Sequence, residues 1–124
     1  MHYLLVFIGG GIGSIARLAT SSLVGKYTGV NFPWGTLTVN LVGAFVIGMI
    51  IEILGVKFSA PENLRYFLVT GFLGGFTTFS AFSLECSAML VRGDYLSMIG
   101  YVAISIIGSI ALVIFATNFV RVLI

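Results

Sequence analysis

Charged and metal-ligating side chains are scarce in this sequence. Its 124 residues include four acidic side chains, six Lys and Arg, one histidine and one cysteine. Cys86 has no partner for an intrachain disulfide, and with His2 it supplies too few ligands for a zinc or iron–sulfur site. We expect Cys86 to be a small packing residue and His2 to be solvated. The sequence predicts no enzyme active site, no organic cofactor and no nucleic-acid partner.

Apolar sequence is abundant instead. Hydrophobic residues make up 59% of the chain and charged residues 8%, and the mean hydropathy is +1.16, far outside the range of soluble domains. A helix that crosses the hydrocarbon core needs ~20 apolar residues, and such spans can be drawn at about 4–23, 35–54, 64–91 and 96–120. The connecting segments are too short for a soluble domain. Residues 1–124 are therefore predicted to form one all-α domain of four transmembrane helices in the lipid bilayer.

Lys and Arg are spread almost evenly over the two ends of this predicted bundle. Lys57, Arg65 and Arg121 flank one side of the membrane, while Lys26 and Arg92 flank the other. Because cytoplasmic loops normally carry an excess of these residues, the orientation signal is weak. Two interpretations stay open. The balance is either chance in a small protein, or the chain inserts in both orientations and pairs as an antiparallel dimer.

Several polar side chains lie inside the apolar spans, where hydrocarbon cannot satisfy them. Arg17 either snorkels to the surface or pairs with the structure, or it contacts a permeating anion. Asn40, on one face with Thr36 and Gly43, either bonds to another helix or lines a polar pathway. The fourth span carries a narrow polar stripe that is either a packing seam or a pathway lining: Ser97, Tyr101, Ser105, Gly108 and Ser109.

The stretch "GFLGGFTTFSAF" in the third span combines glycines, hydroxyl residues and phenylalanines. Glycine costs about 1 kcal/mol in a helix interior, so the sequence predicts a break near 74–78. Irregular backbone at membrane depth persists only where it is buried in protein or lines a cavity, and its free carbonyls commonly coordinate a cation. Ahead of this span, "SAPE" predicts a capping box in which Ser59 pairs with Glu62.

Phe79 and Phe82 are three residues apart and are expected to share a face just after the break, with Ser80 beside them. The edge of a phenyl ring is the positive rim of its quadrupole. Ring edges, hydroxyls and the Asn40 amide together favour an anion without a permanent positive charge, which would hold the ion too tightly.

Three stretches, "GGGIGSIAR", "GTLTVNLVGAFVIG" and "GFLGGFTTFSAFSLE", resemble the Fluc/CrcB family of fluoride channels. The resemblance implies a fluoride-selective channel that exports fluoride passively and lowers cytoplasmic fluoride. It also implies an antiparallel, dual-topology homodimer in a bacterial plasma (inner) membrane. A structural sodium ion is implied at the dimer centre, held by backbone carbonyls from the break of each chain.

The resemblance also assigns expected roles to individual residues. Gly74 and Thr77 would give the sodium-coordinating carbonyls, Phe79 and Phe82 would face fluoride, and Asn40 would be the pore amide. Hydroxyl donors along the pathway would be Thr36, Ser80, Tyr101, Ser105 and Ser109. Two further positions match the family pattern as vestibule or structural residues without a definite role: Arg17 and Glu85. Ala81 departs from the pattern, because family members often have threonine there.

Two alternatives belong to other classes. A small multidrug-type, proton-coupled transporter is also a four-span dual-topology dimer, but it needs a central carboxylate. The first span has no acidic residue and Glu52 lies near a span end, so Glu85 is the only candidate. The other alternative is an accessory subunit of a larger complex that transports nothing by itself.

Overall fold

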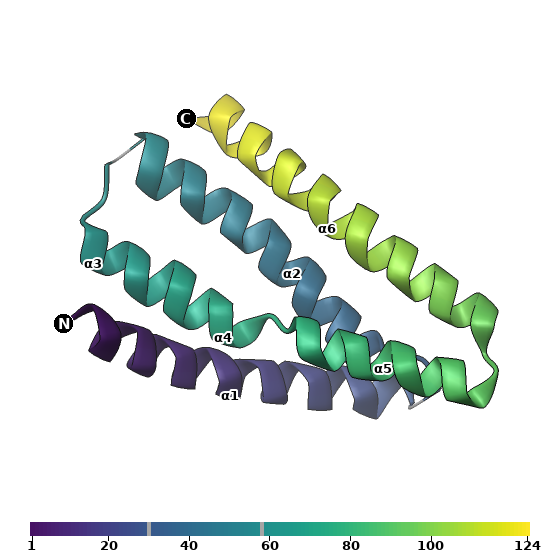
Figure 1. Ribbon diagram of the computed structural model, residues 1–124. Helices are drawn as coiled ribbons and strands as arrows, with labels where there is room; N and C mark the ends of the chain where they lie inside the picture. Colours follow the sequence, from purple (N-terminus) through teal and green to yellow (C-terminus); the bar gives the residue numbers. More distant parts are fainter. Residues whose placement is uncertain (30, 58) are drawn as a thin grey trace.

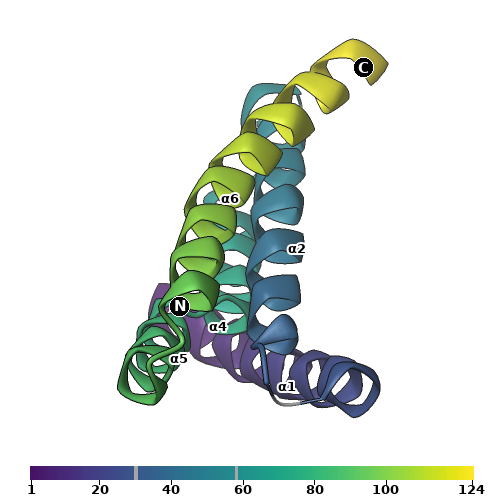
Figure 2. The ribbon, with the colours of Figure 1, turned by 90° about the vertical axis from the view of Figure 1, so that its right-hand side faces the viewer.

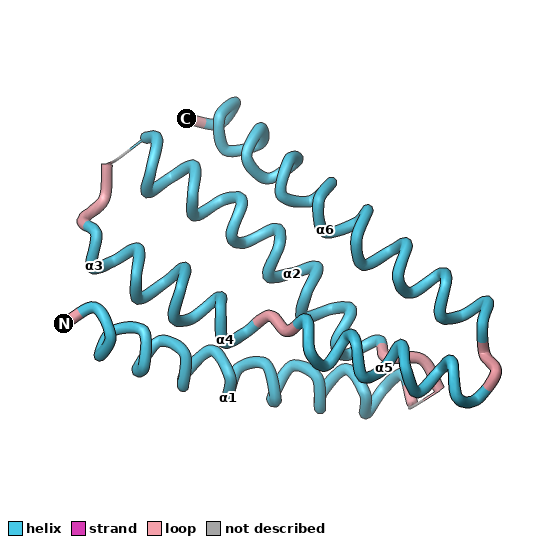
Figure 3. The backbone as a smooth tube through the Cα atoms, in the orientation of Figure 1, coloured by secondary structure: helices cyan, strands magenta, loops and turns pink. Residues whose placement is uncertain are grey.

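Residues 1–29, 31–57 and 59–124 are described by the computed structural model. Within these ranges all regular elements are helices, and short loops join them (Figure 3). In chain order the elements are α1 (His2–Thr28), α2 (Trp34–Ile50), the π-helix η1 (Ile51–Lys57), α3 (Glu62–Arg65), the π-helix η2 (Tyr66–Leu73), α4 (Gly74–Phe76), α5 (Phe79–Arg92) and α6 (Tyr95–Leu123).

Four helical stretches are long and apolar enough to cross a membrane: His2–Thr28, Trp34–Gly55, Glu62–Arg92 and Tyr95–Leu123. They confirm the prediction of an all-α protein with four membrane spans. Each stretch reaches beyond the bounds drawn from the sequence, because the structured helices continue past the apolar core into flanking polar and aromatic residues. At these ends Tyr3, Tyr27, Trp34 and Tyr95 are exposed, as expected of side chains at a membrane–water interface.

Close backbone contact joins α1 to η2 and α4. Gly9 and Gly13 are buried, and a Cβ atom at either position would collide with the carbonyl oxygen of Phe67 or Phe72. Gly75 is packed in the same way against the backbone of Gly10. Gly9 and Gly13, four residues apart on one face of α1, therefore allow close helix packing, which matters because lipid gives helices no hydrophobic reason to associate.

The second and fourth spans pack along each other. Figures 1 and 2 show α6 running beside α2. At one end of this contact Arg121 donates to both carboxylate oxygens of Glu52, with distances of 3.0 and 3.2 Å. Glu52 is only 1% exposed, so this bidentate pair joins the end of α6 to η1.

Extended backbone separates α4 from α5. Thr77 has φ −85° and ψ 157°, and Thr78 has φ −151° and ψ 120°. The hydroxyl of Thr78 then accepts a hydrogen bond of 3.1 Å from the N–H of Ala81, so Thr78 caps the N-terminus of α5. At its other end α5 stops at Gly93, whose φ of 77° suits glycine.

One local expectation was wrong, and one was confirmed. The capping box does not form, because Pro61 is the residue before α3 and Ser59, with φ 48°, lies in a turn that folds back on the preceding helix. There the N–H of Ala60 donates to the carbonyl of Leu54. The imidazole of His2 is exposed, but it also stacks on Tyr66 with ring centroids 4.3 Å apart.

Candidate functional site

A cavity of about 500 Å³ lies between α2, the interrupted third span and α6. It brings together seven of the residues singled out from the sequence: Asn40, Gly74, Thr77, Phe79, Phe82, Ser105 and Ser109. Because they come from three separate spans, the cavity exists only when the helices have packed.

Asn40 is hydrogen-bonded to the interruption of the third span, which is the extended pair Thr77 and Thr78 between α4 and α5. Its Oδ1 atom accepts from the N–H of Thr78 at 2.8 Å, and its Nδ2 atom donates to the carbonyl of Thr78 at 3.0 Å. One side chain on α2 thus satisfies both backbone groups of an extended residue. A primary amide has two N–H donors, so one remains for another partner. The two readings of Asn40 are not exclusive, because it bonds across to another segment and also lines the cavity.

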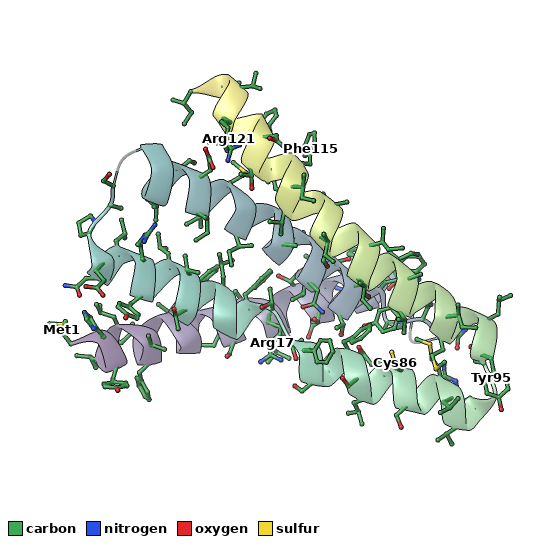
Figure 4. The ribbon with its side chains drawn as sticks, turned by 45° about the horizontal axis from the view of Figure 1, so that its top comes forward. Met1, Arg17, Cys86, Tyr95, Phe115 and Arg121 are labelled. Atoms are coloured by element: carbon green, nitrogen blue, oxygen red, sulfur yellow. The ribbon has the colours of Figure 1, made fainter. Side chains whose placement is uncertain are left out.

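Of the backbone carbonyls near the end of α4, some accept hydrogen bonds and others do not. The carbonyl of Leu73 accepts from the N–H and the hydroxyl of Thr77. The Nε atom of Arg17 donates to the carbonyl of Gly75 at 3.1 Å, and Figure 4 shows this side chain on α1 at the level where α4 ends. Arg17 is therefore paired with the backbone. Among the described residues, no donor reaches the carbonyl oxygens of Gly74 and Thr77.

These two carbonyls suit a hard cation. Such ions take oxygen ligands, usually six or more, and a carbonyl without a donor in an apolar setting gains from any positive partner. Within one chain these two oxygens would fill only part of such a shell.

The two phenylalanines after the interruption differ in burial. Phe82 is 7% exposed and Phe79 is 76% exposed in the single chain. Their ring centroids are 5.3 Å apart, and Phe82 also lies 5.0 Å from the ring of Tyr101, with interplanar angles of 42° and 50°. Phe82 is therefore held in place by its neighbours, while Phe79 forms an open side of the cavity.

The polar stripe of α6 opens onto the same cavity through Ser105 and Ser109. Ser105 is 8% exposed, and its hydroxyl has no hydrogen-bond partner among the described residues. A buried polar group without a partner costs roughly 1–3 kcal/mol. The oxygen itself is buried, so Ser105 places beside the cavity a polar group that the described residues leave unsatisfied. Ser80, in contrast, is exposed and lies 3.2 Å from the hydroxyl of Thr78, away from the cavity lining.

A second polar group lies next to the cavity. Glu85 accepts from the hydroxyl of Thr36 at 2.8 Å and from that of Tyr101 at 2.9 Å. We call Thr36, Glu85 and Tyr101 the carboxylate cluster. Sequence reasoning named all three residues but did not bring them together. Their spacing in the sequence could have indicated the cluster, because each of the three residues lies about one helical turn from a residue that lines the cavity.

The chain is similar to known proteins over nearly its whole length. The model of a family described as "CrcB-like protein, Camphor Resistance (CrcB)" matches residues 4–117. A protein of Rhizobium etli is 46% identical over 121 residues, which are 98% of this chain and 97% of the relative. One from Granulibacter bethesdensis is 42% identical over 124 residues, 100% of this chain and 98% of the relative. Both relatives bear the name fluoride-specific ion channel FluC.

Proposed function

The chain belongs to the CrcB-like family, and on this premise we propose that it is a fluoride-selective channel of a bacterial plasma membrane. Hydrogen fluoride enters a cell as a neutral acid and ionises inside. A passive pathway for the anion, driven by the membrane potential, is then enough to lower cytoplasmic fluoride. No coupling reaction and no enzymatic step is needed.

One observation supports the anion pathway most directly. Two residues that line the same cavity have hydrogen-bonding capacity left: Ser105, whose hydroxyl has no partner among the described residues, and Asn40, whose amide keeps one N–H beyond the bond to Thr78. Fluoride is small and tightly hydrated, so a pore must replace its water with several donors. Each hydrogen bond to a charged group contributes about 1.5–3 kcal/mol, and Ser109 and the ring edges of Phe79 and Phe82 add further stabilisation. Together these groups offset much of the dehydration cost.

We further propose that the third span acts as a broken membrane helix at the centre of an antiparallel homodimer. The exposed ring of Phe79 leaves one side of the cavity uncovered, and a second copy would cover it. The near balance of Lys and Arg over the two ends suits a chain that inserts both ways. A structural sodium ion fits the unsatisfied carbonyls of Gly74 and Thr77, where it would supply a fixed positive charge.

The rival transporter function depends on Glu85, the carboxylate closest to the cavity. Both of its oxygens accept hydrogen bonds from the hydroxyls of Thr36 and Tyr101. These bonds join Glu85 to α2 and α6, so the side chain is held between helices, which suits a structural carboxylate better than one that must bind and release a transported cation.

Reconstitution of the purified chain tests the function. Liposomes loaded with potassium fluoride or potassium chloride are made permeable to potassium, and anion release is followed with ion-selective electrodes. We expect rapid fluoride release and chloride release close to that of empty liposomes, because a narrow apolar pore compensates the larger ion too little. Comparable fluxes of the two anions would refute selectivity. No fluoride flux from the chain alone would favour the accessory subunit.

A further inference from the structure

Gly43 lies on the same face of α2 as Asn40, and both residues line the cavity. Gly43 is buried. A Cβ atom at this position would collide with the Cγ2 methyl of Thr77 and would lie 3.6 Å from Cδ2 of Phe76. The side chain of Thr77 therefore packs directly against the backbone of α2, in space that only glycine leaves open.

Thr77 is anchored in this contact by its own hydrogen bonds. Its hydroxyl donates to the carbonyl of Leu73 at 2.9 Å, and its N–H donates to the same carbonyl at 3.0 Å. Threonine is stiff at χ1, and a rotation that removed the methyl group from α2 would also break the hydroxyl bond. A Cβ atom at position 43 would therefore displace Thr77 as a whole, with its backbone.

The backbone that would move carries the carbonyl of Thr77, which receives no donor from the described residues. This carbonyl and the N–H of Thr78 belong to one peptide group, which is planar and trans. That N–H donates to Oδ1 of Asn40 at 2.8 Å. Because N–H and C=O point in opposite directions across a trans peptide, the carbonyl oxygen of Thr77 points away from the Asn40 amide. Asn40 thus sets the direction of this peptide group, and Gly43 sets how closely Thr77 approaches α2.

We propose that Gly43 is a positioning residue for the sodium ion, and that it acts by seating Thr77 so that the Thr77 carbonyl reaches the ion. This inference rests on the proposed function, in which Gly74 and Thr77 supply the coordinating carbonyls. Groups that orient metal ligands typically change metal affinity about 10–100-fold when they are substituted. Gly43 has no side chain to offer an ion, so its substitution acts on sodium through Thr77.

The test measures sodium affinity without any ion flux. The purified protein in detergent is heated at a series of sodium chloride concentrations, with N-methylglucamine chloride keeping the ionic strength constant, and its unfolding temperature is followed. A ligand of the folded protein raises this temperature once its concentration exceeds the dissociation constant. We expect Gly43→Ala to raise the sodium concentration at which stabilisation begins by about tenfold or more.

Thr77→Ser separates positioning from general packing. Serine keeps the hydroxyl that donates to Leu73 but lacks the methyl group that a Cβ atom at position 43 would meet. When Gly43→Ala is added to Thr77→Ser, the sodium dependence should shift less than about threefold from that of Thr77→Ser, because residues in contact are energetically coupled. The double variant moves a methyl group across the contact, so it should fold even if Gly43→Ala alone does not.

Gly48→Ala is the matched control. Gly48 is also buried in α2, but a Cβ atom there would meet Val113 and Ala116 on α6. This variant should lower the unfolding temperature at every sodium concentration without shifting the sodium dependence.

Three results would overturn the inference: a wild-type sodium dependence in Gly43→Ala, an equal shift in the Thr77 and Thr77→Ser backgrounds, or a double variant that does not fold. A wild-type protein whose stability ignores sodium would refute the central cation and this inference with it. A wild-type protein that responds to sodium but releases no fluoride would instead refute the proposed channel function.

Discussion

Asn40→Asp is the substitution that separates the two tasks of the Asn40 side chain. The carboxylate keeps an acceptor for the N–H of Thr78, now as a charge-assisted bond. It loses the donor that reaches the carbonyl of Thr78 at 3.0 Å, and it loses the second N–H of an amide that lines the cavity. The chain should therefore still fold around the interruption, while the pathway gains a negative charge.

The magnitudes predict a larger effect on conduction than on stability. Leaving the carbonyl of Thr78 without its donor costs about 1–3 kcal/mol, a loss that the retained bond partly offsets. A carboxylate about 4 Å from a fluoride ion repels it by about 4 kcal/mol at an effective dielectric constant of about 20. That energy corresponds to about three powers of ten in ion occupancy. Fluoride release should fall to the leak of empty liposomes.

Asn118→Asp provides the matched control for this change. Asn118 lies on α6 in an exposed position, and its amide donates only to the carbonyl of Ile114 within its own helix. The same chemical change there should leave fluoride release within about twofold of wild type. Both variants are checked for an unchanged elution volume in detergent. Fluoride release from correctly assembled Asn40→Asp within tenfold of wild type would refute the assignment of Asn40 to the pathway.

Three further predictions follow from the aromatic pair, the interruption and the charge balance. Phe82→Ile keeps apolar bulk but removes the ring edge, so fluoride release should fall at least tenfold with an unchanged elution volume; normal release would indicate a purely steric ring. Exchange of sodium for a large organic cation during purification should weaken the dimer, measured by cross-linking in detergent, and indifference after long exchange would contradict a central cation. Reporter fusions at the C-terminus should be active in both compartments, and two or three added lysines at one end should fix one orientation; a single orientation of the unaltered chain would exclude dual topology.

The helices themselves could be predicted because membrane burial imposes a simple requirement on composition. An apolar run of sufficient length must be helical, since its backbone groups have no other partners in lipid. The ends were less predictable. The sequence around Ser59 did not indicate that Ala60 donates to Leu54, nor that Pro61 and not Ser59 is the residue before α3, which leaves no capping box.

The sequence predicted a weak point at 74–78, and the extended residues lie there, at Thr77 and Thr78. Glycine and threonine disfavour a helix locally, so this feature can be predicted without tertiary information. The hydrogen-bond partners of the interruption could not be predicted from the sequence. The donation from Arg17 to Gly75 and the pairing of Asn40 with Thr78 join residues separated by 58 and 38 positions. Such pairings depend on how α1 and α2 dock, which periodicity does not specify.

The distribution of hydrogen bonds around the interruption explains why three separate spans carry distinctive residues. If Thr77 and Thr78 were left to themselves, the freed backbone groups would cost several kcal/mol in hydrocarbon. Asn40 on α2 and Arg17 on α1 satisfy the carbonyls of Thr78 and Gly75, so the interruption is held by two other helices. The carbonyls of Gly74 and Thr77 receive no donor from the described residues, and these two residues also line the cavity. The unsatisfied groups therefore lie where an ion or a second copy of the chain can reach them. An interruption satisfied on every side would be more stable in the membrane but would offer no free carbonyl to an ion.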